Sequence, residues 1–85
     1  MFYTYILYSE NFDLFYIGQT NNLDDRISRH NQNRNKWTKN KGPWAIVFSK
    51  SFPTRAQAVQ LEIFLKALKN RTALVQWIND NTTGQ

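Results

Sequence analysis

Four side chains with chemical capacity are spread along this 85-residue chain. They are two strand-borne phenols, a guanidinium and a single carboxylate, in the order Tyr5, Tyr16, Arg26 and Glu62. One carboxylate and a substrate phosphate suffice to hold Mg²⁺, which prefers oxygen ligands and keeps several waters. A guanidinium suits phosphate oxygens, and a phenol can take a proton from water. The set therefore predicts metal-assisted cleavage of a phosphodiester bond.

Positive charge is concentrated in one part of the chain. The net charge is +5, but all eleven lysines and arginines lie between Arg26 and Arg71. That segment holds one acidic residue, Glu62, so eleven positive charges less one negative charge leave it at +10. A strongly positive region suits a polyanion, of which nucleic acid is the commonest. The alternative is a solvated basic surface that only keeps the protein soluble.

Length and composition limit the class of protein. A chain of this size makes one small domain, which we place at residues 1–80, with residues 81–85 as a frayed C-terminal tail. The absence of cysteine excludes disulfides and thiolate metal sites and suits the cytoplasm. The uncharged run over residues 1–9 is shorter than the roughly 20 residues of a membrane span, and no basic stretch precedes it. We therefore expect a cytoplasmic protein without a membrane segment, monomeric or weakly dimeric.

The first two elements predicted are the strands of an antiparallel hairpin. Aromatic and β-branched residues favour strands over residues 2–8 and 14–19, joined by a turn. Tyr5 and Tyr16 should therefore lie on neighbouring strands. Gly18 within the second strand indicates a place where another group approaches the backbone closely.

A helix should follow the hairpin. Asn22 is a typical N-cap, and Leu23 and Ile27 have the spacing of an apolar helix face. Arg26 lies on the same side, and His30 follows it by one helical turn, so the two side chains can face one site.

The remaining elements complete an α+β fold. The polar, basic stretch over residues 32–43 predicts a mobile loop, and residues 44–51 predict a third strand. Thr54 should cap a helix, and Thr72 a last short one. The apolar face of the longer helix should contain Leu61, Phe64, Leu65 and Leu68. The expected architecture is a three-stranded antiparallel sheet flanked by helices, in the order ββαβαα.

These residues, taken in order, resemble the GIY-YIG nuclease superfamily. The first motif appears as Thr4-Tyr5-Ile6, with threonine in place of glycine, and the second is intact as Tyr16-Ile17-Gly18. Further matching residues are Gln19 to Arg26 (many members carry a lysine where Gln19 stands), Arg29-His30-Asn31, Thr38, and Phe52-Pro53-Thr54-Arg55-Ala56 leading to Glu62. The run is most similar to the small stand-alone YhbQ-like branch, and more distantly to the N-terminal nuclease domain of bacterial excinuclease C.

The resemblance implies the GIY-YIG nuclease fold and a divalent-metal-dependent DNA endonuclease, with Mg²⁺ or Mn²⁺ bound by Glu62. It also implies that Tyr5, Tyr16, Arg26 and His30 are active-site groups. Arg26 would hold the scissile phosphate, either tyrosine would activate water, and His30 would relay a proton or hold the phosphate.

Each of these side chains also has a purely structural interpretation. Glu62 is spaced for an i,i+4 ion pair with Lys66 on a solvated helix face. Arg26 could pair with Asp24 or another carboxylate at the surface. A lone histidine on a helix is often a satisfied structural residue, and tyrosines pack well in strands whatever the function.

A basic group of residues is the candidate DNA contact. Lysines and arginines neutralise phosphates without reading sequence, and a tryptophan can stack on a base or wedge into a groove. The alternative is a flexible basic loop with its tryptophan tucked onto the core. The candidate residues are Arg29, Arg34, Lys36, Trp37, Lys39 and Lys41.

The function expected is hydrolysis of DNA, with RNA open as an alternative partner. A single module offers little surface for reading sequence, so we expect low sequence specificity or selectivity for a DNA structure, in repair, recombination or processing. Two other interpretations stay open. One is a non-catalytic nucleic-acid-binding module that retains the fold, and the other is a toxin-like or repair accessory protein that acts only with a partner.

Overall fold

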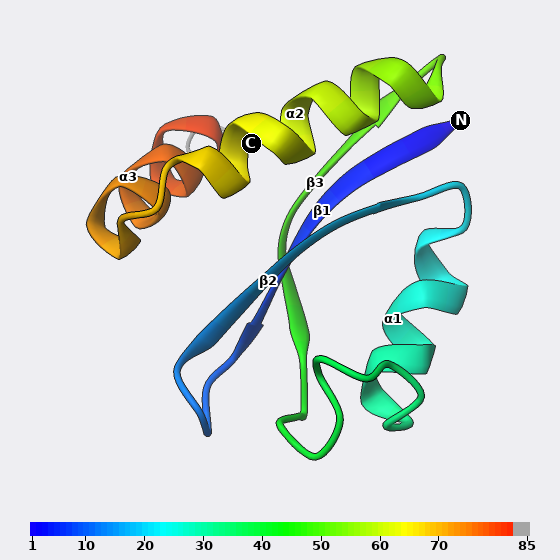
Figure 1. The fold of residues 1–85 in the computed structure, drawn as a ribbon, viewed down its shortest axis with the longest axis vertical. Helices are drawn as coiled ribbons and strands as arrows, with labels where there is room; N and C mark the ends of the chain where they lie inside the picture. Colours follow the sequence, from blue (N-terminus) through cyan, green and yellow to red (C-terminus); the bar gives the residue numbers. More distant parts are fainter. Residues whose placement is uncertain (83–85) are drawn as a thin grey trace.

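The computed structural model describes residues 1–82. In this part of the chain the elements follow the order ββαβαα, which confirms the predicted α+β fold (Figure 1). They are β1 (Phe2–Ser9), β2 (Leu14–Thr20), α1 (Leu23–Asn31), β3 (Ala45–Phe52), α2 (Arg55–Ala67) and α3 (Arg71–Thr82).

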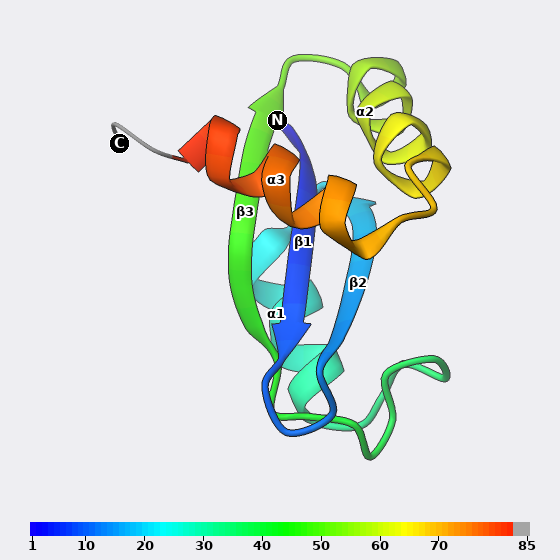
Figure 2. The same ribbon diagram turned by 90° about the vertical axis from the view of Figure 1, so that its left-hand side faces the viewer.

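The sheet has β1 in the middle, with strand order β2-β1-β3 and antiparallel pairing on both sides. Tyr5 lies opposite Gly18 on β2 and opposite Ser49 on β3. Helix α1 covers one face of the sheet, and α2 and α3 cover the other (Figures 1 and 2). The fold therefore has three layers, with a hydrophobic cluster on each side of one central sheet.

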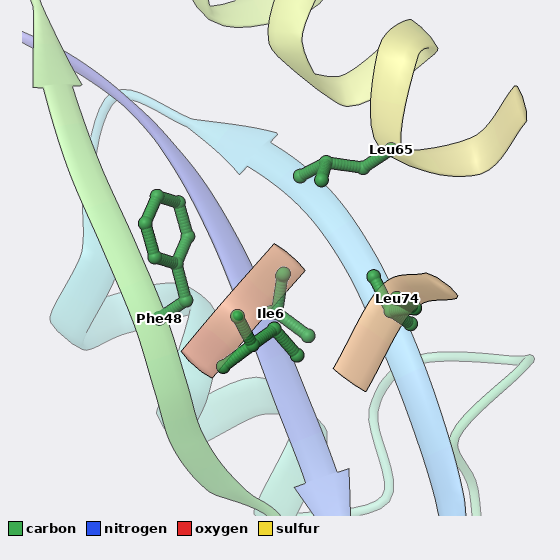
Figure 3. Packing of buried hydrophobic residues seen from close by; sticks show 5 residues of the cluster. Ile6, Phe48, Leu65 and Leu74 are labelled. Carbon is green, nitrogen blue, oxygen red and sulfur yellow. The ribbon is translucent and has the colours of Figure 1, made fainter. Parts of the chain in front are cut away.

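Alternation along β1 supplies both clusters, because successive side chains of a strand point to opposite faces. Ile6 packs with residues of α2, α3 and β3, and Figure 3 shows Phe48, Leu65 and Leu74 around it. Tyr5 and Leu7 belong to the cluster on the α1 side, together with Trp44. The central strand β1 thus contributes Ile6 to a largely aliphatic core on one face of the sheet and the aromatic ring of Tyr5 to the cluster on the other face.

Thr4 joins the central strand to α2. Its hydroxyl donates a hydrogen bond of 2.7 Å to the carbonyl of Ala58, and both residues are fully buried. A buried polar group is stable only when it is hydrogen-bonded. The threonine that departs from the GIY motif therefore has a structural role here, as a bond between two layers.

Side-chain caps begin all three helices. The side chain of Asn22 accepts from the backbone N–H of Asp25, and that of Thr54 accepts from Gln57, as predicted. The third cap differs from the expected Thr72, because Oδ1 of Asn70 accepts from the backbone N–H groups of Thr72 and Ala73. Helix α3 is also longer than predicted, at 12 residues.

Helix α3 continues through Asn81 and Thr82, two residues beyond the domain end expected at residue 80. The side chain of Asn81 donates to the carbonyl of Trp77, and that of Thr82 donates to Ile78. The rest of the expected tail, residues 83–85, lies outside the described residues. No helix of the described part is long and apolar enough to cross a membrane.

The basic stretch between α1 and β3, predicted as a mobile loop, is anchored at its base. The side chain of Asn31 accepts from the backbone N–H of Trp44 at 2.6 Å and donates to its carbonyl at 3.1 Å. The indole of Trp44 in turn donates to the carbonyl of Thr38 at 3.2 Å. The amide of an asparagine side chain can hydrogen-bond a backbone N–H and a backbone carbonyl as a neighbouring strand would. The Asn31 side chain therefore holds the two ends of the loop together.

Candidate active site

The phenol of Tyr5 lies across Gly18 of the neighbouring strand. A Cβ atom on Gly18 would lie 2.6 Å from Oη of Tyr5 and 2.8 Å from its Cζ, which is closer than side chains tolerate. Only glycine leaves room for the ring at this position. The close approach to the backbone predicted for Gly18 is confirmed, and the approaching group is the first motif tyrosine.

Three rings gather on the α1 side of the sheet. The ring centroids of Tyr5 and Tyr16 are 6.3 Å apart, and those of Tyr16 and His30 are 4.6 Å apart. The hairpin brings the two phenols together because Tyr5 and Tyr16 lie on paired strands, and α1 adds the imidazole from the next layer. The structure thus brings together three of the residues selected from the sequence.

His30 uses both ring nitrogens. Its Nε2 lies 3.1 Å from Oη of Tyr5, and its Nδ1 lies 2.7 Å from Oγ1 of Thr38. All three side chains are buried. Thr38 was noted in the sequence only as a matching residue, without a role. A threonine in a polar loop carries no local signal that it will contact a buried histidine.

Burial and the nearby charges set the protonation of this group. Burial and, to a smaller extent, the positive charge of Arg26 together lower the pKa of His30 to about 4. Burial also raises the pKa of Tyr5, and so do Tyr16 and the Glu62 carboxylate, against a smaller lowering by Arg26. At neutral pH the imidazole is therefore neutral and the Tyr5 phenol keeps its proton.

The side chain of Arg26 has a buried nitrogen, Nε. Its Nε has no hydrogen-bond partner among the described residues. The alternative of a pair with Asp24 or another carboxylate does not form within residues 1–82, and the ion pair on this helix joins Asp25 and Arg29 at 3.0 Å instead. Its charge acts on both Tyr5 and His30, so the guanidinium belongs to their surroundings. A buried donor without a partner costs free energy, which a bound anion would recover.

Glu62 lies on α2, in the layer opposite α1. Its side chain is only 19% exposed, and its Oε2 is 2.9 Å from Nζ of Lys66. The ion pair of the structural interpretation is therefore present. The charge of the carboxylate nevertheless contributes to the raised pKa of Tyr5.

The donor set suits one kind of metal site. Within residues 1–82, no three or more His, Cys, Asp or Glu side chains are grouped to hold an ion. A site at Glu62 would therefore combine one carboxylate with waters and substrate oxygens. Mg²⁺ is commonly held in this way, by one or two carboxylates and substrate phosphates, so the residues present fit it.

The candidate DNA-contacting residues divide into two groups. Arg29 lies on α1 and is paired with Asp25. The loop residues Arg34, Lys36, Lys39 and Lys41 are exposed and form no ion pair in the described part of the chain. Trp37 is 75% exposed, so the alternative of a tryptophan tucked onto the core is wrong. The loop presents an indole and its positive charges to solvent.

The fold and the site define a GIY-YIG catalytic domain. Residues 1–75 match that family, and the chain belongs to it. GIY-YIG domains form a nuclease-type family.

Similar proteins share the designation UPF0213. UPF0213 protein YazA of Bacillus subtilis is 36% identical over 58 residues, which cover 67% of this chain but only 59% of YazA. UPF0213 protein CPE1444 of Clostridium perfringens is 36% identical over 75 residues, covering 87% of this chain and 80% of that protein. The solution NMR structure of UPF0213 protein BH0048 from Bacillus halodurans has a TM-score of 0.59 and 29% identity, and covers 99% of this chain and 88% of that one.

Proposed function

We propose that this protein is a divalent-metal-dependent endonuclease that hydrolyses DNA phosphodiester bonds. The observation that carries the proposal is the unsatisfied, buried Nε of Arg26 within a GIY-YIG domain. An arginine whose charge acts on a phenol and an imidazole, and which lacks an acidic partner in the described structure, is suited to a phosphate.

Arg26 would hold the scissile phosphate. A guanidinium presents two parallel N–H donors to phosphate oxygens and keeps its charge at any physiological pH. The surrounding burial strengthens this electrostatic interaction, because charges interact more strongly away from water. The phosphate would thereby be fixed next to the three rings.

The two phenols are not equivalent. The hydroxyl of Tyr5 is hydrogen-bonded to His30, is buried, and has a raised pKa, so it is poorly suited to remove a proton. Tyr16 is half-buried, and its hydroxyl has no hydrogen-bond partner within residues 1–82. We assign proton removal from the attacking water to Tyr16, which would act as a phenolate once its own proton has passed to solvent. Tyr5, held by neutral His30, would position that water or the phosphate.

Glu62 would hold Mg²⁺ or Mn²⁺. When bound, such an ion neutralises charge on the phosphate and stabilises the leaving oxygen. The side chain of Lys66 now neutralises Glu62, and its own 57% exposure allows it to move to solvent.

Selectivity should be low for sequence and higher for DNA structure. A specific interface with DNA generally buries more surface than one small module offers. The charges of the exposed loop neutralise phosphates and carry no sequence information. We place the activity in DNA repair, recombination or processing in the cytoplasm, which suits a chain without cysteine.

The test uses purified protein with supercoiled plasmid and branched oligonucleotides, in Mg²⁺, Mn²⁺ or EDTA. Glu62→Gln and Arg26→Ala are compared with the wild type after circular dichroism has shown that both are folded. Metal-dependent nicking that both variants lose supports the proposal. Binding without cleavage, unchanged in both variants, would instead identify a non-catalytic binding module.

A further inference from the structure

A groove of about 760 Å³ runs along the outer edge of β2, beside the candidate active site. Strand β2 is an edge strand, so its outer side has no strand partner within the sheet. The floor is formed by residues 14–17 of β2. One wall contains Trp37 and Lys41 of the loop before β3, and the other contains Lys69 and Arg71 between α2 and α3. Figure 2 shows the loop and the α2–α3 junction projecting on the same side of β2.

The charge of this groove favours an anionic occupant. Lys41, Lys66, Lys69 and Arg71 line it, against one acidic residue, Asp13. Arg71 pairs with Asp13, and Lys66 pairs with Glu62. Lys41 and Lys69 form no ion pair in the described structure. Two cations, one on each wall, are thus available to phosphates.

The aromatic side chains that line the groove restrict the kind of anion that fits it. Trp37 projects to solvent with 75% of its surface exposed, and Tyr16 and Trp44 also line the groove. An exposed indole between cations is the arrangement on which bases of a single strand stack. The bases of a duplex are already stacked on each other and leave no face for Trp37 unless the duplex is opened.

The groove is also of the wrong size for a duplex. Its volume is in the range that holds a small organic ligand, about 300–1,000 Å³, and suits one or a few splayed nucleotides. It is continuous with the candidate site, because Tyr16 and Thr38 belong to both. A strand that enters here would reach the phosphate position beside Tyr16.

We propose that this groove binds an unpaired DNA strand that leads into the active site. A base stacks on Trp37, and phosphates contact Lys41 and Lys69 from the two walls. This inference rests on the proposed nuclease function and narrows its substrate to DNA with a single-stranded segment next to the cut. The other occupant that an open strand edge invites is a β-strand from a second copy of the chain.

The test measures binding apart from cleavage. Fluorescence anisotropy in EDTA compares a labelled oligothymidylate with a labelled duplex, for Trp37→Ala and for the double variant Lys41→Gln/Lys69→Gln. Phe64→Ala removes a half-exposed aromatic ring outside the groove, and Lys50→Gln removes an exposed cation on β3. Circular dichroism confirms that all four variants are folded.

Trp37→Ala should weaken single-strand binding by about fivefold or more and leave duplex binding unchanged. The double variant should reduce the slope of log K against log salt by about 1.4, from two phosphate contacts of about 0.7 each. The two control variants should bind like the wild type. Equal losses of affinity for single-stranded and duplex DNA, or no loss of affinity at all, would refute the proposal that the groove binds an unpaired strand.

Two further readouts separate this proposal from others. Sedimentation that shows self-association abolished by the groove variants would place a second copy in the groove and refute the proposal. If the wild type binds single strands through the groove but cuts no DNA, the nuclease function fails and the strand-binding site stands. If the wild type cuts branched DNA and Trp37→Ala changes neither binding nor cutting, the proposed strand binding in the groove is refuted and the nuclease function stands.

Discussion

The imidazole of His30 and the hydroxyl of Thr38 meet inside the protein, with Nδ1 and Oγ1 2.7 Å apart and both side chains fully buried. This contact joins α1 to the basic loop before β3. It also fixes the plane of the imidazole, so that Nε2 faces the phenol of Tyr5. The loop that presents Trp37 to solvent therefore also orients a side chain of the site.

Thr38→Val tests this contact at nearly constant volume. It leaves Nδ1 of His30 buried without a partner, which should lower the free energy of unfolding by about 1–3 kcal/mol. Thr38→Ser keeps the hydroxyl and should lose less, about 1 kcal/mol for the missing methyl group. Urea denaturation measures both. A valine variant as stable as the wild type would show that the hydrogen bond does not form.

Protonation of His30 should couple stability to pH. Burial and, to a smaller extent, the charge of Arg26 together lower its pKa to about 4. Between pH 6.5 and about 4 the unfolded chain therefore binds a proton that the native state does not. The free energy of unfolding should be unaffected by this group above pH 6.5 and should fall as the pH drops through that window. The loss should reach at most about 3 kcal/mol near pH 4.

The chain's single histidine makes this measurable. An NMR titration of the ring protons gives the pKa directly, and urea denaturation from pH 7 to pH 4 gives the stability. His30→Gln should show a flatter profile in the same window, since all other titratable groups are common to both proteins. A ring that titrates near 6.5 would contradict the prediction.

Arg26→Met should separate stability from function. It removes the unsatisfied Nε of Arg26 from a buried position, so the free energy of unfolding should rise by about 1 kcal/mol while DNA cleavage is lost. The pKa of His30 should also rise, because a nearby positive charge has gone.

Arg29→Met is the matched control on the same helix. Its exposed ion pair with Asp25 contributes at most about 1 kcal/mol, and its loss should leave the pKa of His30 unchanged. Lower stability of Arg26→Met than of Arg29→Met would show that Arg26 is satisfied in the folded protein.

Gly18→Ala should disturb the site through Tyr5. The new methyl group would meet Oη and Cζ of Tyr5, so the ring must move and its bond to His30 must weaken, at a cost of about 1–3 kcal/mol. In a Tyr5→Phe background the atom at 2.6 Å is absent, and the same substitution should cost less. A double-mutant cycle by urea denaturation measures the difference. Strict additivity of the two changes would mean that ring and glycine are not in contact.

Local sequence patterns were sufficient for the elements and their order. Aromatic and β-branched residues predicted the strands, and Asn22 and Thr54 marked two helix starts, because strand preference and caps depend on neighbouring residues. The third start was misassigned since Asn70 and Thr72 are both good caps. Only the geometry shows that Oδ1 of Asn70 reaches two backbone N–H groups.

The candidate site was predictable only for residues that belong to a sequence motif or to the regular spacing of a strand or helix. The pairing of Tyr5 with the Gly18 position follows from the hairpin, and the helical spacing of Arg26 and His30 follows from α1. The burial of Thr38 does not follow, because it depends on packing between a loop and a helix. The isolation of the Arg26 Nε is likewise a property of the whole arrangement, which no local pattern contains.

The central position of β1 has a consequence for synthesis on the ribosome. Strand β2 follows β1 closely and can pair with it early, whereas the partner on the other side, β3, ends only at Phe52. At about 5–20 residues per second, the nascent hairpin waits roughly 2–6 seconds with one side of β1 unpaired. During that interval the exposed edge can pair with another chain, so slowing translation before residue 52 should increase aggregation.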